Sequence, residues 1–204
     1  MNTNSGAQPP LKESNRPLAD LPPLPSLCSA GALRPVPSEA ACLALWDKYG
    51  MLPNIRRHSL LVAHVAATLA QRAADRGFAV HVPEVRAGGL LHDIAKTYCV
   101  KHGGSHAQVG AAWAVAETGN YAIAQGVMMH VWWPWALPQG PEICSLPFFV
   151  IYADKRIRHD ACVTPDERYE DLPERYGRTE AAREGIGVAF RHGKNIKSGI
   201  EAQQ

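Results

Sequence analysis

The segment GLLHDIAK, residues 89–96, places His92 and Asp93 side by side directly after an apolar run, with Lys96 three residues later. A buried histidine needs only a hydrogen-bond partner, but a buried carboxylate without a partner carries a large desolvation cost. An imidazole and a carboxylate next to each other at the end of an apolar helix therefore indicate a polar site built into the protein core.

The composition of the 204 residues is that of an ordinary globular protein, with 46% hydrophobic and 20% charged residues. The net charge of +2 gives no sign of binding to nucleic-acid polymers through bulk charge. No apolar run reaches the roughly 18 residues that span a bilayer, and the N-terminus has no hydrophobic signal-peptide core. Five cysteines without a C-x-x-C pair argue against a disulfide framework and a zinc knuckle. These features predict a cytoplasmic protein that does not associate with membranes.

Helical periodicity dominates the chain after residue 37, and no segment alternates polar and apolar residues for long. One clear helix face carries His58, Leu61, Val62, Val65 and Leu69. The predicted fold class is therefore all-α, with helices over 38–50, around 58–69, over 84–96, from Ser105, over 121–130, over 143–159, from Thr164, and over 178–191.

Three segments divide the chain. Residues 1–37 are rich in proline, in stretches such as QPP and LPPLP, and are expected to form an extended or disordered arm. Residues 38–192 are expected to form a single helical domain, in which Gly88 and Gly89 permit close helix packing. Residues 193–204 are expected to form a C-terminal tail.

Several polar residues interrupt otherwise apolar helical segments. They are His58, His92, Asp93, His106, His130 and Asp154. One histidine on an apolar face is usually a hydrogen-bonded core residue, but six such residues in one domain are better explained by convergence on a metal. Imidazole and carboxylate suit Fe, Mn, Co, Ni or Zn. Six ligands exceed the need of one ion and suit two divalent transition-metal ions that share a bridging carboxylate.

The order of these residues, in the segments RHSLLVAHVA, AGGLLHDIAK and FFVIYADKR, resembles the HD-domain metal-dependent phosphohydrolase superfamily over residues 39–192. The resemblance implies a helical bundle in which the first ion is held by His58, His92, Asp93 and Asp154. It implies that His106 and His130 are the additional ligands of the two-metal branch, in which Asp93 bridges the ions.

That branch includes cyclic-dinucleotide phosphodiesterases of the HD-GYP type and bacterial enzymes that cleave diadenosine tetraphosphate. The sequence lacks the GYP tripeptide that names the first group. The segments HAQVGA and ADKR make it more similar to the second group. The resemblance thus implies hydrolysis of a phosphate ester or anhydride of a nucleotide or similar small molecule by a metal-activated hydroxide.

Further residues are candidates for contact with that substrate. Asp93 and Lys96 are the expected catalytic residues, and Lys96 lies one helical turn after Asp93, within reach of a phosphate oxygen. Arg158 follows one turn after the last ligand, and Trp132 and Trp133 follow His130. An ordinary role remains open for each: a solvated lysine at a helix end, a surface arginine, or tryptophans that cap the core or form a homodimer contact.

Two other functions remain open from sequence. Histidine and carboxylate ligands around two ions also resemble the HD-type diiron oxygenases that act on phosphonates or polyols. A non-catalytic module that binds a nucleotide is the second alternative. The expected partner in the preferred interpretation is a small phosphorylated substrate, without a nucleic-acid polymer.

Overall fold

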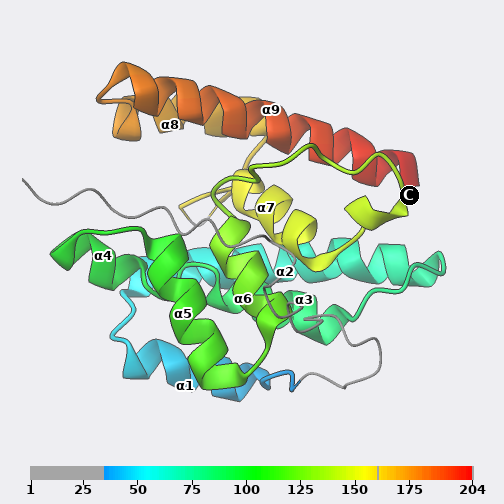
Figure 1. The fold of residues 1–204 in the computed structure, drawn as a ribbon, viewed down its shortest axis with the longest axis horizontal. Coiled ribbons are helices and arrows are strands. Elements are labelled where there is room, and N and C mark those ends of the chain that lie inside the picture. The colour runs from blue at the N-terminus through cyan, green and yellow to red at the C-terminus, as the bar shows by residue number, and fades with distance from the viewer. Residues whose placement is uncertain (1–34, 160, 204) are drawn as a thin grey trace, which may run out of the picture. The chain divides into compact units, whose positions relative to one another are not determined.

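The computed structural model describes residues 35–159 and 161–203, and its regular structure is almost entirely helical (Figure 1). The elements are α1 (Glu39–Lys48), α2 (Pro53–Asp75), α3 (Val82–Leu91), α4 (Lys96–His102), α5 (His106–Thr118), α6 (Tyr121–Met129), η2 (Pro141–Ile143), α7 (Leu146–Arg156), β1 (Ile157–Arg158), β2 (Ala161–Cys162), α8 (Pro165–Tyr176) and α9 (Glu180–Gln203). The all-α prediction is confirmed. The predicted arm lies outside the described residues except for 35–37, and it stays a prediction.

The long helix α2 is the main support of the site, because it contacts both α3 and α7. Its inner face is lined by small residues, and Ala63, Ala66 and Ala70 are completely buried. A side chain added at Gly89 in α3 would place its Cβ 2.6 Å from the Cα of Ala63. The backbones of α2 and α3 can approach this closely only because Gly89 has no side chain, so the predicted close packing is confirmed.

A turn over residues 92–95 separates α3 from α4, so the predicted single helix over 84–96 is wrong. The backbone N–H of Ile94 donates to Leu91 O and that of Lys96 to Asp93 O, three residues back instead of the four of an α-helix. On the outer side, the Trp46 indole of α1 donates to Leu90 O over 2.9 Å. The tightened backbone lets the adjacent side chains of the turn enter the core together.

Side-chain caps fix where α5 and α6 begin. Ser105 Oγ accepts a hydrogen bond from Gln108 N, and Asn120 Oδ1 accepts from the backbone N–H groups of Ala122 and Ile123. The two helices contact each other along their length, and Gly110 lies against Val127. This packing brings the start of α5 next to the end of α6.

The helix α7, in which every residue from Leu146 to Asp154 is buried, is shorter than the predicted helix over 143–159. Pro147 is accepted only in the first turn of a helix, so α7 begins at Leu146. At the other end, Ile157–Arg158 and Ala161–Cys162 form a two-stranded antiparallel pair. The Arg156 side chain donates to Val163 O over 2.6 Å and holds this reversal of the chain in place.

Two C-terminal helices pack against each other and against α7 (Figure 1). Thr164 begins α8 with a full capping box, which confirms the predicted helix start. The predicted end of the last helix near residue 191 is wrong, because α9 continues to Gln203 through most of the residues expected as a tail. Ile196 and Ile200, spaced by one helical turn, are buried and extend the apolar face of α9 past Gly193.

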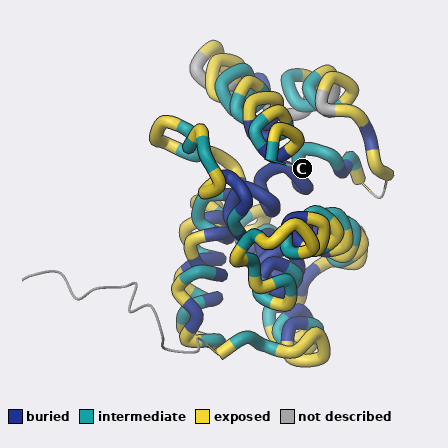
Figure 2. Tube along the Cα trace, turned by 90° about the vertical axis from the view of Figure 1, so that its right-hand side faces the viewer, coloured by how far each residue is buried: buried dark blue, intermediate teal, exposed yellow. Residues whose placement is uncertain are grey.

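The buried segments gather where α2, α3, α6 and α7 face one another (Figure 2). Four polar residues with almost no exposure lie among them: His92, Asp93, Asn120 and Ser59. None of the described helices combines the length and apolar character that a membrane span requires.

Replacing Gly89 tests the close approach of α2 and α3. Gly89→Ala should lower the free energy of unfolding by about 1–3 kcal/mol, because the new methyl group meets backbone atoms that cannot give way. The matched control is Gly185→Ala in α9, where an added Cβ meets nothing within 4 Å and helix propensity should raise the free energy by roughly 0.5–1 kcal/mol. Denaturant titration measures both, and equal stability of the two variants would contradict the packing.

Candidate metal centre

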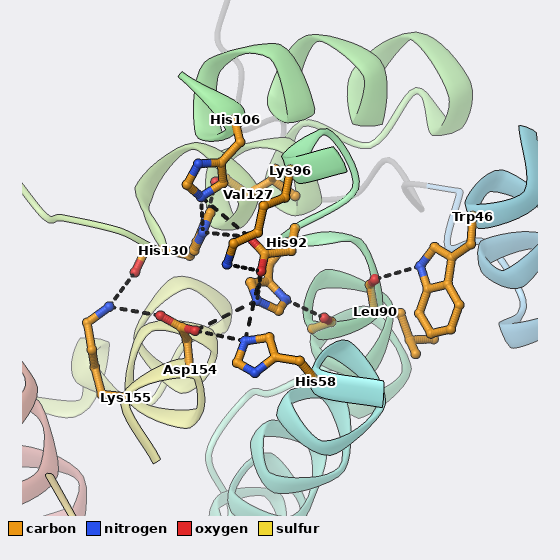
Figure 3. Close-up of polar contacts among 12 residues, drawn as sticks. Trp46, His58, Leu90, His92, Lys96, His106, Val127, His130, Asp154 and Lys155 are labelled. Carbon is orange, nitrogen blue, oxygen red and sulfur yellow. Dashed lines mark hydrogen bonds and ion pairs between the residues drawn. The ribbon is translucent and has the colours of Figure 1, made fainter. Parts of the chain in front are cut away.

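The structure brings together the six residues that the sequence singles out as metal ligands, and Figure 3 labels all of them except Asp93. They come from five places in the chain: α2 gives His58, the turn after α3 gives His92 and Asp93, the start of α5 gives His106, the end of α6 gives His130, and α7 gives Asp154. The sequence separation between the first and last is 96 residues. The fold therefore builds the cluster by long-range packing.

Asp93 lies at the centre of the cluster, and its side chain is 1% exposed. Its Oδ2 faces the first pair of histidines, 3.5 Å from His92 Nε2 and 3.9 Å from His58 Nε2. Its Oδ1 faces the second pair, 3.3 Å from His106 Nε2 and 3.6 Å from His130 Nε2. The two oxygens of one carboxylate thus point to two different groups of nitrogen atoms.

Asp154 joins the first of these groups. Its Oδ1 lies 3.1 Å from His58 Nε2 and 3.9 Å from His92 Nε2. Two ligand atoms bound at about 2.0–2.2 Å to the same ion are roughly 3 Å apart, so these separations are close to those of ligands around a shared cation.

Backbone carbonyls set the orientation of two imidazoles. His92 Nδ1 donates to Gly89 O and His130 Nδ1 donates to Val127 O, each over 2.7 Å. Because a carbonyl oxygen only accepts, Nδ1 of each ring carries a proton, which leaves Nε2 as the nitrogen that faces the cluster. Hydrogen bonds of this kind fix the tautomer of metal-binding histidines.

Two buried acceptors in the cluster have no hydrogen-bond partner within the described part of the chain: His92 Nε2 and Asp93 Oδ1. An orphaned buried acceptor is costly, and two of them beside further acceptor atoms call for a cation. A metal ion satisfies both. The residues present therefore fit a metal, with His58, His92, Asp93 and Asp154 available on one side and Asp93, His106 and His130 on the other.

The electrostatics of the cluster keep its ligands in the forms that bind metal. Burial lowers the pKa of His92 to about 3 and the pKa of His106 to about 4, so both are neutral at pH 7. Burial alone would raise the pKa of Asp93 and Asp154. The charges of Lys96 and Lys155, together with the neighbouring histidines, nevertheless hold both pKa values well below the ordinary range.

Two lysines border the cluster. Lys96 Nζ lies 2.6 Å from Asp93 Oδ2, and Lys155 Nζ lies 2.9 Å from Asp154 Oδ2 and 3.3 Å from His130 O (Figure 3). The sequence singles out Lys96 as a candidate for phosphate contact but does not single out Lys155. Its position directly after Asp154 was the available signal.

A cavity of about 580 Å³ opens beside the cluster, and His106, His130 and Asp154 form part of its wall. Trp132 also lines it. The neighbouring Trp133 is not among the described lining residues, because its ring packs against Phe148 with centroids 4.7 Å apart.

Arg158 lies elsewhere, in β1. The described residues that line the cavity do not include it. Hydrogen bonds with Thr164 lower the pKa of Glu167 at the start of α8, and the charge of Arg158 adds to this effect.

Removing the central carboxylate should remove the metal. Asp93→Asn keeps the shape of the side chain but not its charge, and loss of a direct ligand should weaken metal binding by at least about 100-fold, the upper end of what loss of an outer partner costs. Elemental analysis of the purified variant measures this. His64→Ala is the matched control, because His64 is an exposed residue of α2 outside the cluster. Full metal content in Asp93→Asn would contradict the site.

The metal-free protein should lose stability as the pH falls from about 6.5 to about 4. The unfolded chain takes up protons on its histidines below pH 6.5, whereas the folded chain cannot protonate His92 and His106 until about pH 3–4. Asp93 and Asp154 contribute stability that is lost only at lower pH. Urea titrations at pH 7 and pH 5 measure the loss. It should shrink in His106→Gln but not in His64→Gln, and a pH-independent wild type would refute this.

The comparisons with known proteins agree with this geometry. The chain is 31% identical over 150 residues to Ribonuclease Y of Pseudothermotoga lettingae, a match over 74% of this chain and 26% of that protein. It is 43% identical over 58 residues to an uncharacterized protein of Methanocaldococcus jannaschii, over 28% of this chain and 33% of that one. The chain thus spans between a quarter and a third of the length of these curated relatives. No solved structure matches it.

The HD domain family matches residues 55–158, about half of the chain, and the matched region contains all six clustered residues. The histidine–aspartate pair in the turn after α3 lies within this matched region. The chain belongs to the HD domain family of metal-dependent phosphohydrolases.

Proposed function

We propose that the protein hydrolyses a phosphate ester or anhydride of a small molecule, such as a nucleotide, at a dinuclear metal centre. The observation that carries the proposal is the central carboxylate of Asp93, whose two oxygens face two separate pairs of histidine nitrogens. This is the arrangement expected of a carboxylate shared by two ions.

The two sides of Asp93 differ in a way that suits hydrolysis. The side with His58, His92 and Asp154 offers more ligands and lies deeper, since His92 is fully buried. The other side offers His106 and His130, and the His106 side chain is 28% exposed and lines the cavity. Bound ions would act there as Lewis acids and lower the pKa of a water molecule. The side with fewer ligands leaves room for water and substrate.

Residues of the chain itself would bind the phosphate. Lys96 and Lys155 both line the cavity next to the cluster, and Lys96 is 31% exposed. Fixed positive charge at this place would attract a phosphate group and stabilise the negative charge that grows on its oxygens during hydrolysis. Asp154 and Asp93 hold the two ammonium groups in position.

A small substrate is favoured over a polymer. The similarity to Ribonuclease Y makes RNA cleavage the competing hypothesis, but it covers only 26% of that protein. A net charge of +2 offers little of the phosphate-backbone attraction that polymer binding depends on. A cavity of about 580 Å³ falls within the usual size range of small-molecule sites.

Metal analysis of the purified protein, followed by an assay of phosphate release, tests the proposal. The panel should contain nucleotides, simple phosphate esters and a single-stranded RNA oligonucleotide, with Asp93→Asn as the inactive control. About two ions per chain and release from a small phosphate compound are expected. Cleavage of the RNA alone would support the competing function. Two irons with oxygen consumption and no hydrolysis would support an oxygenase, and tight nucleotide binding without turnover would support a binding module.

A further inference from the structure

We infer that α8 and α9 select the substrate, and that the substrate carries a flat aromatic group beside its phosphate. The inference rests on the proposed function for the phosphate end of the substrate. The aromatic end is argued separately, from the apolar residues that line the cavity.

The cavity has two chemically different parts. The ligands and lysines of the metal centre form the polar part. The other part is mainly apolar. It includes Val131 and Trp132 after α6, Leu172 in α8, and Ile186 and Ala189 in α9, and Arg168 of α8 adds one charged group. A compound that is only a phosphate would fill the first part and leave the second in contact with water, so the cavity is built for a ligand with an apolar portion.

Trp132 indicates the shape of that portion. Its indole is 56% exposed although it lines the cavity. A large exposed aromatic ring beside a phosphate site offers a flat face on which another ring can stack, and such stacking is worth about 1–3 kcal/mol per nucleic-acid base. Together with Trp132, the aliphatic side chains of Leu172 in α8 and of Ile186 and Ala189 in α9 form what we call the apolar slot for such a ring.

The slot is formed largely by a part of the chain that the HD family match does not include. That match ends at residue 158, and α8 begins at Pro165. The six candidate ligands therefore lie within the matched region, whereas Leu172, Ile186 and Ala189 lie beyond it. The residues that recognise the apolar portion can thus differ without any change in the metal ligands.

Contacts hold the two helices in place over the site. Tyr169 of α8 stacks on Phe190 of α9 with ring centroids 4.2 Å apart. The chain of Lys155, whose ammonium group contacts Asp154, packs against Gly193, where an added Cβ would lie 3.4 Å from Lys155 Cγ. One lysine thus joins the metal centre to α9, and the apolar wall has a fixed position relative to the phosphate site.

Gly185 provides a direct test, because it lines the cavity and an added Cβ meets no atom within 4 Å. Gly185→Leu would therefore fill the slot while keeping the helix, since leucine is the better helix former. Glu184→Leu, at the adjacent exposed position, is the matched control for added apolar surface. Trp132→Ala removes the stacking face.

Calorimetric binding to the protein as purified should compare 1-naphthyl phosphate, adenosine monophosphate and methyl phosphate. The wild type should bind at least one of the two aromatic phosphates about tenfold or more tightly than methyl phosphate. Gly185→Leu and Trp132→Ala should lose most of this preference, and Glu184→Leu should keep it. Tighter binding of adenosine monophosphate would identify a nucleobase as the aromatic group, and tighter binding of the naphthyl compound a simpler ring.

Equal binding of all three compounds, or a preference that survives Gly185→Leu, would overturn the inference. Parallel measurement of phosphate release separates it from the proposed function. A preference without hydrolysis would leave the inference standing and refute the hydrolase. Hydrolysis of methyl phosphate and 1-naphthyl phosphate with equal kcat/KM would support the hydrolase and refute the inference of an aromatic group.

Discussion

The site is organised around one buried carboxylate, whose negative charge must be balanced by its surroundings. Asp93 is almost fully enclosed, and a charge in such a place is tolerated only when opposite charge and ligand partners surround it. Lys96 supplies one positive charge at 2.6 Å, but Asp93 Oδ1 still lacks a hydrogen-bond partner among the described residues. A metal ion bound there would supply the missing positive charge and a partner for Oδ1. Side chains from α2, from the start of α5 and from the end of α6 face this one group in the turn after α3.

The backbone at Gly89 contributes to the site twice. Its missing side chain lets α3 approach α2 at Ala63, which carries His58 of the same helix toward the cluster. Its carbonyl oxygen accepts from His92 Nδ1 and turns the other ring nitrogen inward. Packing and ligand orientation are thus coupled through one residue, so a change that spread the two helices apart would also disturb the metal ligands.

Much of this was predictable from sequence, and the exceptions have physical causes. Periodicity gave the helical class, and a polar residue in an apolar face marked each member of the cluster. Local patterns failed where long-range contacts decide the backbone, as at the turn over 92–95 and at the β1–β2 pair. Sequence also could not tell which of two adjacent indoles faces the cavity: Trp132 lines it, whereas Trp133 packs on Phe148. The sequence did not indicate that Lys155 contacts Asp154, because a lysine that follows a buried helical segment is usually solvated.

The two parts of the chain that line the cavity differ in their relation to the HD family match. The six ligand candidates lie within the HD-matched residues, while Leu172, Ile186 and Ala189 lie beyond them. Similarity to Ribonuclease Y therefore informs the metal centre more than it informs the ligand that the cavity accepts. Ile196 and Ile200 of α9 are buried and lie outside the cavity lining. The stability of the packed helix therefore depends more on these two side chains than on those that line the cavity. Such positions can change to fit another substrate without loss of the metal centre.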